Sequence, residues 1–262
     1  MASNDPYRAT NSGYAVPPSG GGVQYARMLT FVFESPNWLM NIVWSALCAL
    51  LSGLVVGQLV MYGYQAQILI SSLHNRDAVY PDFDSNKIGD YLLRGLWVWL
   101  GILIASMLLG FLLFFCLVAL ILIMALLQLL TSDGNSVPVF IRVGMVVGYF
   151  LIIGGGVISS FLLVTPVAIK LCLSGNLSEL FDWGWHIDFI KRTFGSMIMA
   201  TLMLIFSGML LSLIGILACF IGIFPATGWL MMSQAQMYCQ LYRAYLERGG
   251  TPVNVQAIGS NI

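Results

Sequence analysis

Three segments of this chain, residues 38–74, 95–130 and 193–224, run for more than 30 residues without a charged side chain, and they limit its possible folds more than any other feature. Residues 95–130 and 193–224 hold 36 and 32 uncharged, mostly apolar residues. As an α-helix the first would be about 54 Å long, whereas the hydrocarbon core of a bilayer is about 30 Å thick. The chain is 59% apolar and 8% charged, against about 25% charged in soluble domains. The sequence therefore predicts an all-α, polytopic integral membrane protein whose main partner is the lipid bilayer.

The number of crossings depends on how the long runs are divided. Residues 38–74 and 144–171 are each predicted to cross once. Residues 95–130 are long for one crossing and slightly short for two, and we favour a tight helical hairpin with Gly110 near its turn. Treating 193–224 in the same way gives about six transmembrane helices, whereas one crossing for each long run gives four. Basic residues divide seven to four in the six-helix arrangement with cytoplasmic termini and six to five in the alternative, so the positive-inside tendency favours six.

A polar motif occurs twice beside these runs, as PDFDSNKIGDYLLRG (81–95) and LFDWGWHIDFIKRTF (180–194). The copies align at an offset of 98 residues, which pairs Asp84 with Asp182, Asp90 with Asp188, and Arg94 with Arg192. Apolar residues recur at helical spacing in each copy, which predicts a short amphipathic helix lying at the membrane surface. The first pair lies where N-caps belong, and the other four residues form i, i+4 pairs of opposite charge. The repetition indicates two pseudo-repeats, at about 42–130 and 143–246, each with one interfacial anchor helix.

Small residues and a proline indicate where membrane helices pack or bend. Gly53 and Gly57, and again Gly144 and Gly148, have the GxxxG spacing that lets two helix backbones approach closely in lipid. Thr165-Pro166 predicts a kink near the end of its helix.

The ends of the chain are polar. A disordered tail is expected over 1–37, a helical transmembrane domain over 38–250 and a polar C-terminal tail over 251–262.

The formal net charge is zero, so nothing indicates nucleic acid as a partner. Five scattered cysteines without a CxxC indicate neither a disulfide framework nor a zinc site.

Few residues suggest chemistry. Metal binding by Asp82, Asp84, Asp182 and Asp188 is a weaker interpretation than capping and pairing, because these carboxylates do not form a ligand cluster. His186 with Asp182 and Asp188 makes a thin acid–base group, since only the histidine and Asp182 can share a helix face. The sequence contains no GxSxG, HExxH, P-loop or GxGxxG motif. We expect no cofactor, no metal and no enzymatic activity.

Several ordered motifs resemble a known family. They are Gly63-Tyr64, YPDFD (80–84), Gly95-Leu96, LSGNLSELFDWGWHIDFIKRT (173–193) and ACFIGIFPATGWLMMSQAQMYCQLYRAYLERGGTP (218–252). In these motifs the chain, over roughly residues 40–252, resembles the prokaryotic membrane family called domain of unknown function 4013. The resemblance implies a multi-pass protein in the cell membrane of a bacterium or archaeon, with no established activity and no catalytic residues to transfer.

Two function classes follow. The first is a non-enzymatic scaffold or accessory component of a membrane assembly, with another membrane protein or a second copy as its partner. The alternative is a transporter or channel for a small uncharged or weakly polar solute, built on the duplicated helical unit. Its helix breaks would be residues 154–156 and Thr165-Pro166, with Gln58 and Ser106 as polar lining. The absence of charges near the middle of the spans argues against ion coupling.

Overall fold

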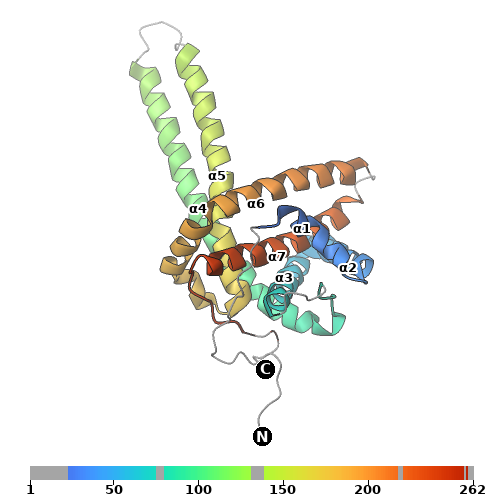
Figure 1. Ribbon diagram of the computed structural model, residues 1–262. Helices are drawn as coiled ribbons and strands as arrows, with labels where there is room; N and C mark the ends of the chain where they lie inside the picture. Colours follow the sequence, from blue (N-terminus) through green and yellow to red (C-terminus); the bar gives the residue numbers. More distant parts are fainter. Residues whose placement is uncertain (1–22, 75–79, 131–138, 218–220, 257, 259–262) are drawn as a thin grey trace.

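In the computed structural model, every regular element within the described residues (23–74, 80–130, 139–217, 221–256 and 258) is helical. The α-helices are α1 (Tyr25–Thr30), α2 (Trp38–Leu50), α3 (Val56–His74), α4 (Ile88–Leu130), α5 (Val139–Ser174), α6 (Trp183–Leu217) and α7 (Ile223–Glu247). Short 3-10 helices are η1 (Phe31–Glu34), η2 (Leu51–Leu54), η3 (Ser85–Lys87) and η4 (Leu177–Phe181). Helices α4 and α5 project together from a body that contains α1, α2, α3 and α7 (Figure 1).

Within the part of the chain that the structure describes, three helices are long and apolar enough to cross a membrane, as expected for a multi-pass membrane protein. The candidate spans are Ser85–Leu126, Val146–Ser174 and Trp183–Leu217. A fourth is obtained if Tyr25–Glu34 and Trp38–Leu54, which meet at 105°, form one broken span. Helices α3 and α7 fall outside this set, since each carries several glutamines and tyrosines.

The prediction of a helical hairpin within residues 95–130 is wrong. Helix α4 continues without a break for 43 residues, and a Cβ added at Gly110 would meet nothing within 4 Å. Leu, Ile, Ala and Phe flank this glycine on both sides, and one glycine costs only about 1 kcal/mol in a helix. The second long run is likewise one helix up to Leu217, with α7 starting at Ile223.

The single span expected over residues 38–74 is also wrong, because the chain breaks into α2 and α3. The break lies at η2, where the Ser52 hydroxyl donates to Cys48 O (2.9 Å) and Val55 N donates to Ser52 O (2.9 Å). Val55 then adopts a φ of 66°, a left-handed conformation that reverses the chain. Helix α2 has 13 residues and is about 20 Å long, which is too short to cross a bilayer alone.

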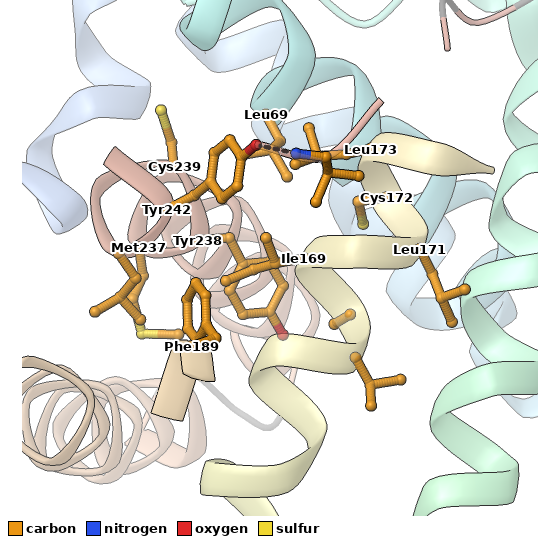
Figure 2. Close-up of a cluster of buried hydrophobic side chains, with 14 of the residues drawn as sticks. Leu69, Ile169, Leu171, Cys172, Leu173, Phe189, Met237, Tyr238, Cys239 and Tyr242 are labelled. Carbon is orange, nitrogen blue, oxygen red and sulfur yellow. Dashed lines mark hydrogen bonds between the residues drawn. The ribbon is translucent and has the colours of Figure 1, made fainter. Parts of the chain in front are cut away.

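Two clusters of buried apolar side chains hold the body together. The larger joins the C-terminal part of α5 to α6 and α7, and Figure 2 shows Ile169, Phe189, Met237 and Tyr238 directed toward one another within it. The smaller cluster joins α2, α3, α7 and the start of α4 and contains Tyr64, Tyr80, Phe83 and Tyr91.

The outer part of the α4–α5 hairpin lies outside this core, and we call residues 107–126 of α4 and 146–158 of α5 the arm. Of the 18 consecutive residues that are most apolar in each helix, only 6% are buried inside the protein. Large apolar side chains of the arm are exposed on both helices: Met107, Leu108, Phe111, Leu112, Phe114, Phe115, Ile121, Leu122, Ile123, Leu126, Val146, Val147, Tyr149, Phe150, Leu151, Ile153, Val157 and Ile158.

The N-terminal region departs from the disordered tail expected over 1–37. Residues 25–34 form α1 and η1, and Met28, Phe31 and Val32 are buried. The Trp229 indole of α7 donates to Leu29 O at 2.9 Å, which ties this segment to the body. Apolar residues every three to four positions outweigh the polar composition here. Residues 1–22 lie outside the described residues.

Candidate functional site

Arg94 of the first anchor is a buried structural group, and the prediction that it forms an ion pair with Asp90 is wrong. The guanidinium donates to Cys172 O (Nη2, 2.9 Å) and Leu173 O (2.6 Å) at the end of α5, and to Gln256 O (3.0 Å). The carbonyls at a helix C-terminus lack intrahelical donors and carry partial negative charge, so they attract this cation. Asp90 is half-buried.

Residues 251–256, here called the C-terminal strap, cross the same end of the molecule. Gln256 N donates to Leu173 O (2.9 Å), and the Trp185 indole donates to Thr251 O (3.0 Å). Val253 N donates to the Tyr242 hydroxyl at 2.8 Å (dashed in Figure 2). The strap thus joins α5, α6 and α7, and through Arg94 it also joins α4. The part of the predicted polar tail up to Gln256 is therefore packed.

A second set of charges lies where α5 meets α6, and we call it the Lys170 cluster. The buried Lys170 ammonium contacts Glu179 Oε2 (2.7 Å) and Asp182 Oδ2 (2.5 Å) and lies 5.2 Å from the centroid of the Trp185 ring. The hydrogen bond from Lys170 and a second from Trp185 N lower the pKa of the Asp182 carboxyl from its ordinary value. A lysine this near a helix end could extend its side chain to the membrane surface, but two carboxylates hold the Lys170 ammonium within the protein.

His186 lies in the Lys170 cluster but does not form the acid–base group considered from the sequence. Its Nε2 lies 3.1 Å from Leu180 O, and its buried Nδ1 has no hydrogen-bond partner among the described residues. Asp188 instead accepts from Arg192 Nε and the Tyr245 hydroxyl, each at 2.9 Å. The carboxylates therefore have other partners and do not converge on the imidazole.

The aspartates of the first anchor have polar partners of their own. Asp82 accepts from the Ser35 hydroxyl (2.7 Å) and from the Asn37 and Asn41 amides (2.7 and 3.0 Å). Partial burial tends to raise the pKa of this carboxyl, but the three hydrogen bonds outweigh burial and lower it. Asp84 accepts from Asn86 N (3.0 Å) and caps η3, as Asp182 accepts from Trp185 N (3.2 Å) at the start of α6. Within the described residues, no three His, Cys, Asp or Glu side chains form a group that could hold a metal ion.

The glycines singled out by the GxxxG spacing have different surroundings. A Cβ added at Gly57 would lie 2.0 Å from Cys48 O, so this glycine permits the tight α2–α3 reversal. Cβ atoms at Gly53 and Gly144 would meet nothing within 4 Å, and one at Gly148 would make ordinary contact with Leu120. Thr165, which is buried, and Pro166 lie inside α5.

A close contact between α3 and α4 involves two glycines outside any GxxxG pair. A Cβ at Gly63 would lie 2.1 Å from Tyr91 O, and one at Gly95 would lie 1.8 Å from Leu59 O, so the backbones of α3 and α4 touch. Both glycines belong to motifs that carry the family resemblance, which was the only signal in the sequence for them.

Helices α3 and α7 meet along a polar seam of uncharged groups. The Gln65 amide nitrogen donates to Met231 O (2.7 Å) and lies 3.4 Å from Gln234 Oε1, and the Gln234 amide nitrogen donates to the Tyr238 hydroxyl (2.7 Å). Gln65 and Gln236 are 1% and 3% exposed. Recurring glutamines in the sequence of α7 were the available signal, but their partner helix was not evident.

Comparison with known protein families gives a match over most of the apolar part of the chain. Residues 46–220, more than half of the chain, match the family model described as "Protein of unknown function (DUF4013)". No curated protein and no solved structure matches the chain.

Proposed function

Because the chain belongs to the DUF4013 family of unknown function, we propose its role from geometry alone: a non-enzymatic scaffold or accessory component of a membrane assembly. We place it in the cell membrane of a bacterium or archaeon. The observation that carries the proposal is the arm, which extends two long apolar helices away from a well-packed body. Arg94, the C-terminal strap and the Lys170 cluster fix the base of the arm.

The arm offers what a partner helix in a membrane could use. Its side chains are apolar on nearly every face, so burying them against lipid or against another membrane helix costs little polar desolvation. Exposed Gly144, Gly154 and Gly155 on α5 leave room for close approach of a second backbone. A catalytic role has less support, because the charged groups of the body are engaged in caps and ion pairs.

The test is photocrosslinking in native membranes. A photoreactive side chain at Phe115 or Phe150, on the arm, should give one discrete protein adduct. The same group at Phe194, exposed on α6, is the matched control and should give lipid adducts. Phe111→Ala combined with Phe115→Ala should lower recovery of the crosslinked partner after mild detergent extraction, whereas Phe194→Ala should not. Lipid adducts alone at all three positions would contradict the scaffold role.

We also propose that the two pseudo-repeats are parallel. The first contains α2, η2, α3, η3 and α4, and the second contains α5, η4, α6 and α7, so in each a 3-10 turn leads into a long helix that begins with the anchor motif. Contact of Arg94 with the end of α5 supports adjacent anchors on one side of the membrane. Cysteines at Ser85 and Ser178 should then react with a membrane-impermeant maleimide from the same side; labelling from opposite sides would indicate inverted repeats.

Passage of a small uncharged solute is the second candidate, and the polar seam between α3 and α7 favours it. Amides and phenols inside an otherwise apolar protein suit a neutral polar molecule. Proteoliposomes should show faster glycerol or urea entry than empty liposomes, and Gln65→Leu should remove the difference. Equal entry rates in protein-containing and empty liposomes would exclude this role.

A further inference from the structure

Helices α6 and α7 form an antiparallel pair, and two arginines meet at one end of it. A Cβ added at Gly215, near the end of α6, would lie 3.0 Å from Ile223 N at the start of α7. At the opposite end, Arg192 of α6 and Arg248, the residue after α7, exchange hydrogen bonds. Residues 193–217, which follow Arg192 in α6, carry no charge. Since α6 is a candidate membrane span, the arginines lie at the boundary between hydrocarbon and headgroups.

Each of the two guanidinium groups is held against the backbone of the other residue. Arg192 Nη1 donates to Arg248 O, and Arg248 Nη1 donates to Arg192 O. Arg248 Nη2 also donates to the Ser196 hydroxyl at 3.1 Å. Both arginine side chains are exposed, so their remaining N–H groups are accessible from outside the protein. We call Arg192 and Arg248 the arginine pair.

The arginine pair has two positive charges and one carboxylate partner. Asp188 Oδ2 lies 2.9 Å from Arg192 Nε and balances that guanidinium. Within the described residues Arg248 forms no ion pair, and neither does Glu247, which precedes it. An arginine has five N–H donors, of which Arg248 uses two, on the neutral acceptors Arg192 O and Ser196 Oγ. The arginine pair is therefore suited to contact an anion.

An apolar strip on α6 leads from the arginine pair into the span. Positions seven apart share a helix face, and the two steps after Arg192 are Met199 and Phe206, which are 52% and 61% exposed. Leu213, one step further, is 57% exposed. Fourteen residues of helix are about 21 Å long, and half of the hydrocarbon core is about 15 Å thick. The strip is therefore long enough to contact one acyl chain along its length.

We propose that the arginine pair and this strip form a binding site for an anionic phospholipid. The phosphodiester lies against the remaining N–H groups of the arginine pair, and one acyl chain lies along Met199 and Phe206. Guanidinium groups suit phosphate oxygens, because their planar N–H groups donate in parallel. A zwitterionic headgroup would bring an ammonium close to the same positive charges. The site does not involve the arm, so its test is separate from that of the scaffold role.

The test is lipid binding to the full-length protein, delipidated in detergent and measured by native mass spectrometry. Phosphatidylglycerol should bind more tightly than phosphatidylcholine with the same acyl chains. Arg248→Gln should weaken phosphatidylglycerol binding about fivefold, the contribution of one basic residue near a membrane surface. Lys87→Gln removes an exposed charge from the first anchor and is the matched control, which should leave the affinity unchanged. Equal affinity of wild type and Arg248→Gln would overturn the proposal.

Two further measurements separate lipid binding from other roles of Arg248. Arg248→Lys keeps the charge but loses the planar donors to Arg192 O and Ser196 Oγ, and it should bind phosphatidylglycerol more tightly than Arg248→Gln. Equally weak binding by the two variants would mean that Arg248 acts only through the fold, and the proposal would fail. Equimolar inorganic phosphate should not displace the lipid, because it has no chain to contact the strip. Displacement by inorganic phosphate would indicate a site for a free anion and would also count against the proposal.

Discussion

Replacing Arg94 by methionine should destabilise the protein far more than a surface ion pair could explain. Methionine matches the length of the arginine stem but removes donors from Cys172 O, Leu173 O and Gln256 O. Leu173 O keeps a second donor, Gln256 N, so two carbonyls lose their side-chain partner at about 1–3 kcal/mol each. Removing the buried charge recovers part of its desolvation cost. The net loss should be about 2–4 kcal/mol, against about 0–1 kcal/mol for an exposed pair.

The assay is reversible unfolding in mixed detergent micelles, monitored by intrinsic tryptophan fluorescence. Arg192→Met is the matched control, because Arg192 forms the exposed i, i+4 pair with Asp188 in the second anchor. Arg94→Lys should fall between wild type and Arg94→Met, since an ammonium cannot donate to several carbonyls in fixed directions. Hydrogen exchange of the C-terminal strap should accelerate in both Arg94 variants. Equal destabilisation by Arg94→Met and Arg192→Met would refute the buried network and restore the surface ion pair.

Three further predictions concern backbone contacts and charge. Gly63→Ala should cost at least 2 kcal/mol because its Cβ would press on Tyr91 O, whereas Gly53→Ala, in open space, should be neutral within about 0.5 kcal/mol in the same unfolding assay. Val55→Gly should raise stability by about 1 kcal/mol by relieving a φ of 66°; a loss would show that the valine side chain matters more. The lowered pKa of Asp182 contributes stability that is present above the ordinary carboxyl pKa and is lost as pH falls through the folded value. Acid should therefore destabilise the wild type more than Asp182→Asn as the pH falls below the ordinary carboxyl pKa of 3.8, and identical pH profiles would exclude the coupling.

The membrane environment and the helical class follow directly from the sequence, because they depend on sums over many residues. A chain that is 59% apolar and 8% charged cannot keep all of its apolar side chains away from water by folding alone, so lipid must cover part of its surface. The helix caps in the two copies of the anchor motif also follow from the sequence, because a cap depends only on residues that are close in the chain. Asp84 and Asp182 each precede a helical segment, and each accepts a bond from a backbone N–H two or three residues later. Such features depend only on neighbours in the chain, so a single sequence contains them.

Partner choice at longer range does not follow from local spacing, and the two copies of the anchor motif show why. Asp90–Arg94 and Asp188–Arg192 have the same i, i+4 spacing, yet only the second forms an ion pair. Around Arg94 the buried carbonyls at the end of α5, which lack intrahelical donors, compete with Asp90. Several carbonyls in a buried position hold a guanidinium better than one half-exposed carboxylate. Arg192 has an exposed side chain and keeps its local partner. Identical motifs therefore differ because the tertiary contacts around them differ.

The positions of the helix breaks also depend on tertiary contacts and could not be predicted from local sequence. Gly110 was the expected turn within 36 uncharged residues, but α4 continues through it, while the real reversal occurs at η2 and Val55, inside a run that seemed uniform. A glycine only permits a turn, and a turn forms where the reversed segments gain contacts. Residues after Val55 gain such contacts, because Gly57 rests on α2 and Gly63 on α4. Beyond Gly110 the arm contacts little of the body, so nothing favours reversal there and the helix runs on. The same lack of internal contacts that keeps α4 straight leaves its apolar surface free for lipid or a partner helix.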